Sequence, residues 1–117
     1  MNPEYKPIGT VQDFTDGKAK RITLDAKVFA VIRIVDQFYA IDDACPHMEA
    51  SLAFGTVEEN SITCPRHGAS FDIRTGKVET LPAIRGVYAY PIKVVDGTVY
   101  LKPTPISDSI PELFRVE

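Results

Sequence analysis

The sequence contains few residues of the kinds that bind transition metals or act as nucleophiles. Its 117 residues include only two cysteines and two histidines. The N-terminal stretch MNPEYKPIGT lacks the basic and apolar regions of a signal peptide, so we expect a cytoplasmic protein. Reduced thiols or thiolate ligands are therefore expected in place of a disulfide.

Long apolar runs and an excess of basic residues are also missing. No run approaches the roughly 20 apolar residues that cross a bilayer. The net charge is -3 at pH 7, whereas a nucleic-acid binder normally presents a basic face. One close basic pair, Lys20 and Arg21, lies in a strand-like stretch. The sequence thus indicates neither a membrane nor a nucleic acid as a partner.

Short β-like runs separated by turns make up most of the chain. Residues 22–36 are rich in β-branched side chains, and Val31, Ile32, Ile34 and Val35 combine alternation with full burial. No long window shows sustained apolar spacing of the helical kind. The pattern favours one small all-β domain, a sandwich or a barrel.

Turns are expected where the residues tolerate the backbone angles that a turn requires. The clearest is Asp96-Gly97, because both central residues of a type I′ turn need a positive φ. Further turns are expected at Asp36-Gln37, at Glu58 to Asn60 and at Thr75-Gly76, and single helical turns near residues 11–15 and 49–52.

The character of the sequence changes after Lys102. Three prolines occur in residues 103–117, and proline removes the N–H donors that a central strand needs. We expect this stretch to be a surface tail, held to the body or to a partner by Leu113 and Phe114.

Both cysteines and both histidines fall in two short stretches, Cys45-x-His47 and Cys64-x-x-His67. One interpretation is a buried pair of cysteines beside ordinary polar histidines. A second is a structural zinc site, although Cys45-x-His47 is tight for one ion. A third is a [2Fe-2S] cluster in which the cysteines hold one iron and the histidines hold the other. Each stretch then sends one ligand to each iron.

The stretches CPHM and CPRHG resemble the Rieske iron–sulfur motif, C-x-H followed by C-x-x-H. The likeness continues through GASFDIRTGKVETLPA, with the pair Phe71-Asp72, with Gly76, and with Pro82 where the family has a proline loop over the cluster. It covers roughly residues 5–102. The resemblance implies that one Rieske-type [2Fe-2S] cluster is bound by Cys45, His47, Cys64 and His67.

The resemblance also implies the architecture. We expect an all-β Rieske fold, in which an antiparallel β-sandwich base carries a small inserted cluster-binding subdomain. The single Rieske domain would span residues 1–102, with the subdomain at about 43–82 and the base formed by 5–42 and 83–102. Residues 103–117 would be the tail.

Two pairs of positions suggest the type of Rieske protein. Ala50 and Arg66 stand where membrane-complex members have an additional disulfide, so the chain resembles the soluble ferredoxins of ring-hydroxylating oxygenases.

Ala69 and Phe71 stand where high-potential members have hydroxyl donors to the cluster sulfurs, while the Ser70 side chain should point elsewhere. Since such donors stabilise the reduced cluster, we expect a reduction potential on the order of -150 mV. A charged Arg66 near the cluster would act in the opposite direction. If Arg66 is instead simply exposed and solvated, its effect is screened and small.

The resemblance places the histidines at a tip that docks on partners. Met48, Pro65, Leu81 and Pro82 would form an apolar rim around this tip, either as a docking surface or simply as packing around the cluster.

Catalytic functions are excluded because the cluster takes both histidines and both cysteines as ligands. With both histidines bound, the chain cannot supply a two-His-one-carboxylate iron site or a Cys–His nucleophile pair. Its glycines contain no G-x-G fingerprint for a dinucleotide. We expect a monomeric one-electron carrier between a reductase and a terminal oxygenase. The alternatives are a small Rieske subunit of an assimilatory nitrite reductase and a structural zinc domain.

Overall fold

The computed structural model describes residues 4–44, 50–65, 68–79 and 86–106. These residues form ten β-strands and two short 3₁₀ helices, and every strand pairing among them is antiparallel. The predicted all-β antiparallel fold is therefore confirmed. The elements are β1 (Lys6–Thr10), η1 (Val11–Asp13), β2 (Lys18–Leu24), β3 (Lys27–Ile34), β4 (Gln37–Asp42), η2 (Leu52–Phe54), β5 (Thr56–Glu58), β6 (Ser61–Thr63), β7 (Ser70–Asp72), β8 (Ala89–Tyr90), β9 (Ile92–Val95) and β10 (Thr98–Leu101).

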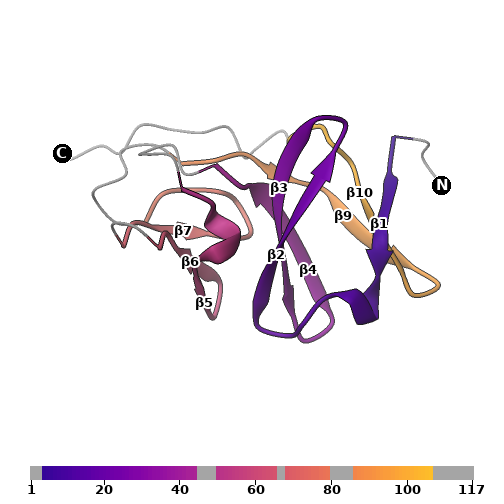
Figure 1. Ribbon diagram of the computed structural model, residues 1–117, viewed down its shortest axis with the longest axis horizontal. Coiled ribbons are helices and arrows are strands. Elements are labelled where there is room, and N and C mark those ends of the chain that lie inside the picture. The colour runs from indigo at the N-terminus through magenta and orange to yellow at the C-terminus, as the bar shows by residue number, and fades with distance from the viewer. Residues whose placement is uncertain (1–3, 45–49, 66–67, 80–85, 107–117) are drawn as a thin grey trace.

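Three sheets follow one another along the long axis of the molecule (Figure 1), whose extents are 45 × 26 × 24 Å. Their strand orders are β1-β10-β9, β2-β3-β4-β8 and β5-β6-β7. The chain leaves the central sheet after β4, forms the β5-β6-β7 sheet, and returns to the central sheet at β8. Both predicted ligand stretches belong to this excursion.

Strand β3 of the central sheet is buried on both faces, which explains its nearly continuous apolar sequence. Side chains alternate along a strand, so β3 contributes Phe29 and Val31 to one apolar cluster and Ala30 and Ile32 to another. All four residues are fully buried. The first cluster includes residues of β10, and the second includes residues of β6 and β7. The predicted burial of Val31 and Ile32 is confirmed.

Three of the predicted turns are confirmed. Asp96 and Gly97 have φ values of 49° and 78° and connect β9 to β10, as a type I′ turn requires. The turn within Glu58 to Asn60 connects β5 to β6. Gly76 has a φ of 80° and closes a turn by donating its N–H to the Asp72 carbonyl at 2.8 Å.

Residues 22–36 differ from the expectation in two ways. They form two strands rather than one, because Asp25 and Ala26 adopt φ values of 52° and 66° and reverse the chain. The next turn consists of Val35 and Asp36 instead of Asp36-Gln37. A turn at Asp36-Gln37 would instead pair Val35 with Phe38 and shift β4 by two residues relative to β3. Val35 is consequently 64% exposed, not buried.

The short helical turns and the start of the tail are close to their expected places. η1 lies within the predicted 11–15 stretch, whereas η2 begins at Leu52, later than predicted, and Glu49 lies outside the described residues. Beyond β10, Ile106 donates its N–H to the Ala89 carbonyl at 2.8 Å and packs against the core. Leu113 and Phe114, the expected anchors, lie outside the described part of the chain.

Asp42 joins the strand by which the chain leaves the central sheet to the strand by which it returns. Its carboxylate accepts a hydrogen bond from the Tyr90 hydroxyl at 2.5 Å and another from the Tyr88 N–H at 2.9 Å. The Asp42 N–H in turn donates to the Tyr88 carbonyl at 3.0 Å. Burial raises the pKa of Tyr90 well above its usual value, and the hydrogen bond to Asp42 adds to the shift.

This contact predicts a loss of stability in alkali. Because the pKa of Tyr90 is raised in the folded state, its stabilising effect is complete below the ordinary tyrosine pKa of about 10 and declines as the pH rises through the folded value. The wild-type urea midpoint should therefore fall more steeply than that of Tyr90→Phe when unfolding is measured from about pH 8 to about pH 11. If the urea midpoints of the two proteins fell equally with pH, the result would contradict this account.

Candidate metal centre

Cys64 lies directly after β6, at the stem of the second predicted ligand stretch. Its N–H donates to the Ala69 carbonyl at 2.7 Å, and its carbonyl accepts from the Gly68 N–H at 3.2 Å. Gly68 has a φ of 76°, a conformation that glycine adopts at little cost. The backbone therefore closes a tight loop from Cys64 to Ala69 and fixes the position of the sulfur-bearing residue.

The surroundings of Cys64 are apolar. Its exposed fraction is 2%, and it shares a cluster with Ala69 and Phe71, both completely buried. The hydroxyl of Ser70 lies 3.1 Å from that of Thr63 on the neighbouring strand, and strand alternation turns it to the face opposite Phe71. An apolar shell of this kind limits water access to a metal group.

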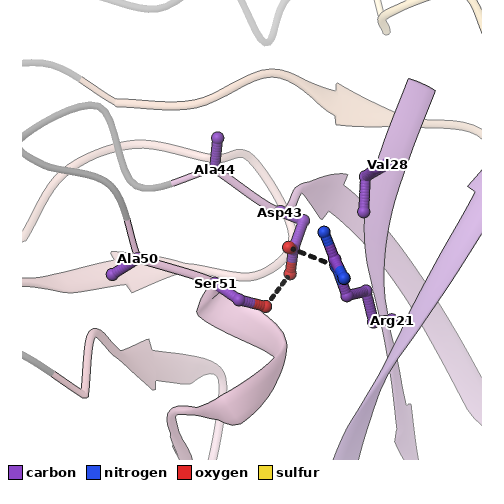
Figure 2. A pocket seen from close by; sticks show the side chains of 6 residues that line it. All are labelled: Arg21, Val28, Asp43, Ala44, Ala50 and Ser51. Atoms are coloured by element: carbon purple, nitrogen blue, oxygen red, sulfur yellow. Dashed lines mark hydrogen bonds and ion pairs between the residues drawn. The ribbon is translucent and has the colours of Figure 1, made fainter. Parts of the chain in front are cut away.

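The first predicted ligand stretch is closed at its stem by a bridge between Ala44 and Ser51. Below this bridge lies Asp43, whose carboxylate accepts hydrogen bonds from the Ser51 hydroxyl at 2.8 Å and the Ala53 N–H at 2.9 Å. Figure 2 shows the Asp43 carboxylate between Ser51 and the Arg21 guanidinium, at an Nε distance of 3.3 Å. Both ends of the stretch are thus tied to one side chain.

Asp43 and Arg21 are functional candidates that the sequence did not reveal. Asp43 was the first residue of the expected subdomain, but no role was predicted for it. Arg21 was considered only as part of a basic pair with Lys20. The only sequence signal is an acidic residue two positions before Cys45. Its pairing with a residue 22 positions away requires the fold.

A close crossing of two chain segments follows the second ligand stretch. The Val87 N–H donates to the Gly76 carbonyl at 2.7 Å. A Cβ added at Gly86 would lie 2.2 Å from the Gly76 oxygen, and one added at Gly76 would lie 1.9 Å from the Val87 oxygen. Only glycine permits this approach, which holds the turn after β7 against the segment that leads into β8.

Gly86→Ala should therefore destabilise the protein by about 1–3 kcal/mol, the usual range for overpacking a tight site. Its backbone must move, because the clashing atom is a carbonyl oxygen rather than a flexible side chain. Urea unfolding followed by circular dichroism measures the change. An unaltered free energy of unfolding would show that the crossing is not constrained.

Most of the predicted site falls outside the described residues. Of the four predicted ligands only Cys64 is described, and Cys45, His47 and His67 are not. The same is true of Arg66 and of three rim residues, Met48, Leu81 and Pro82, while Pro65 is described and exposed. Within the described ranges no group of three or more His, Cys, Asp or Glu side chains gathers around a possible metal position.

The described residues nevertheless fit a group shared by the two stretches. Cys64 belongs to the same apolar cluster against which Ala50, at the end of the first stretch, is packed. The two stretches therefore border one apolar cluster. A buried cysteine at such a junction is suited to supply a thiolate to an iron–sulfur cluster. No helix in the described ranges is long and apolar enough to cross a membrane.

Comparison with known proteins gives consistent results. The Rieske [2Fe-2S] domain family matches residues 4–91. The anthranilate 1,2-dioxygenase ferredoxin subunit of Burkholderia cepacia is 38% identical over 96 residues, covering 82% of this chain and 89% of the relative.

Solved structures show the same relationship. The ferredoxin of carbazole 1,9a-dioxygenase from Nocardioides aromaticivorans IC177 has a TM-score of 0.83 and 30% identity, covering 86% of this chain and 98% of its own. A chain from the complex of reduced oxygenase and oxidized ferredoxin in carbazole 1,9a-dioxygenase has a TM-score of 0.82 and 32% identity, covering 90% and 98%. The protein belongs to the Rieske [2Fe-2S] domain family, as a ferredoxin-type electron carrier with one [2Fe-2S] cluster rather than a catalytic component.

Proposed function

We propose that Cys45 and Cys64 bind one iron of the cluster and that His47 and His67 bind the other. The burial of Cys64 and the packing of both ligand stretches at one apolar cluster support this assignment. The chemistry of the cluster, when bound, is the gain and loss of one electron. The chain itself holds the ligands in place, excludes water on the Cys64 side, and leaves Pro65 exposed beside the ligands.

We also propose that residues 1–102 form one Rieske domain, with a cluster-binding subdomain at about 43–82 and a tail at 103–117. The excursion of the chain between β4 and β8 supports these bounds. Ile106 packs against the core, so the first residues of the tail stay in contact with the body.

The function that these observations support best is an electron relay in a ring-hydroxylating dioxygenase system. The protein would accept one electron from a reductase and deliver it to a terminal oxygenase, as a cytoplasmic monomer that meets each partner in turn. The similarity to ferredoxins of dioxygenases, including one seen in complex with its oxygenase, carries this proposal.

The proposal is tested by mixing the dithionite-reduced protein, freed of excess reductant, with an oxidised ring-hydroxylating oxygenase under anaerobic conditions. The rate of reoxidation should rise with the oxygenase concentration and then reach a plateau. The anthranilate dioxygenase oxygenase component is a suitable first acceptor, because its ferredoxin subunit is a relative. Failure with every oxygenase tried, together with co-purification on a large nitrite reductase subunit, would favour the alternative role.

A further inference from the structure

Asp43 is the one buried charged side chain among the residues that the structure describes, with an exposed fraction of 3%. A buried charge is costly unless hydrogen bonds compensate it. Here both carboxylate oxygens are used: Oδ1 accepts from the Ser51 hydroxyl and the Ala53 N–H, and Oδ2 accepts from the Arg21 Nε. These three donors come from β2 and from the start of η2.

The backbone of Asp43 is held from the same two sides. Its N–H donates to the Val28 carbonyl of β3 at 3.3 Å, and its carbonyl accepts from the Leu52 N–H of η2 at 2.7 Å. The next residue, Ala44, forms the bridge to Ser51. Asp43 therefore connects the central sheet to both ends of the stretch that contains Cys45 and His47.

Stability gained from the ion pair with Arg21 does not explain this arrangement well. The Arg21 side chain is 55% exposed, and ion pairs of exposed groups contribute little to stability. Orientation explains the geometry better, since donors on two separate elements converge on one rigid acceptor (Figure 2).

We propose that Asp43 is a positioning residue, which uses Ser51, Ala53 and Arg21 to hold the first ligand stretch in the geometry that retains the cluster. The inference rests on the proposed ligands Cys45 and His47. Asp42 offers a matched control, because it is the adjacent aspartate, but its carboxylate binds Tyr88 and Tyr90 of the returning strand.

The experiment measures the rate at which the oxidised holoprotein loses iron to a chelator, by following the visible absorption. Asp43→Ala should lose its cluster about 10- to 100-fold faster than wild type, the usual effect of removing a partner that orients metal ligands. Asp43→Asn, which keeps one oxygen for Ser51 and Ala53, and Ser51→Ala should give smaller accelerations in the same direction. Asp42→Asn removes the same charge and should leave the rate within about twofold of wild type.

A general loss of stability is separated from positioning by measuring urea unfolding of each holoprotein and the EPR spectrum of its reduced form. Asp43 variants should show altered or broadened EPR features, whereas Asp42→Asn should lower stability without changing them. If Asp43→Ala does not fold, Asp43→Asn and Ser51→Ala decide the question.

Iron loss at the wild-type rate in both milder variants, or equally fast loss in Asp42→Asn, would overturn the inference. A wild-type protein without a two-iron cluster would instead refute the proposed ligand set, before any variant is compared.

Discussion

The Cys64→Ala variant is expected to contain no iron and no visible colour. Cys64 would supply one of only two thiolates to the cluster, and the chain has no spare cysteine to replace it. The backbone hydrogen bonds of residue 64 to Ala69 and Gly68 do not involve its side chain, so the loop can still close. Iron and sulfide analysis per chain, with the visible spectrum, measures the outcome.

Two controls make this result specific. Chelator-stripped wild type shows how much folding depends on the cluster, since metal binding and folding are commonly coupled. Cys64→Ala should match it by circular dichroism. Thr63→Ala removes the neighbouring hydroxyl that contacts Ser70 and should keep its iron. Were Cys64 only a small buried apolar residue, Cys64→Ala would retain the full iron content.

Ala69→Ser is expected to raise the reduction potential by about 60–130 mV. Ala69 is completely buried in the cluster of residues that includes Cys64, so a hydroxyl there is shielded from water. A hydrogen bond to a charged acceptor contributes about 1.5–3 kcal/mol, and about 59 mV corresponds to a tenfold change for a one-electron couple. The donor favours the more negative reduced cluster, which fixes the sign.

Potentiometric titration followed by visible spectroscopy measures the shift. Ser70→Ala provides the control, because the Ser70 hydroxyl contacts Thr63 and lies on the other face of the strand from Phe71. Its potential should stay close to that of wild type. A potential of Ala69→Ser at or below the wild-type value would mean that residue 69 does not face the cluster.

Local chemistry made the strands and several turns predictable. Asp96-Gly97 is one of the few dipeptides that tolerate positive φ at both positions, and the structure has the turn there. Val35 was wrongly predicted to lie in a buried strand, because a β-branched residue rarely takes the positive φ that a turn position requires. Its φ of 56° belongs to the register in which Ile34 pairs with Gln37.

The candidate site was predictable where adjacent residues define it and hidden where the fold brings distant residues together. The four proposed ligands stand in two short stretches, so spacing alone indicated a metal group. The roles of Asp43 with Arg21, and of Gly76 with Gly86, depend on contacts between separate segments. No local pattern specifies such pairs, because each residue type is common on loops and strand ends.

The most direct test of the central claim is to record visible absorption and low-temperature EPR spectra before and after dithionite reduction, together with metal analysis. The account predicts a coloured protein with the two irons of a [2Fe-2S] cluster per chain. It also predicts a reduced EPR signal of low average g, typical of mixed cysteine and histidine ligation. A colourless protein that contains zinc, and that does not acquire colour on reconstitution with iron and sulfide, would contradict the account.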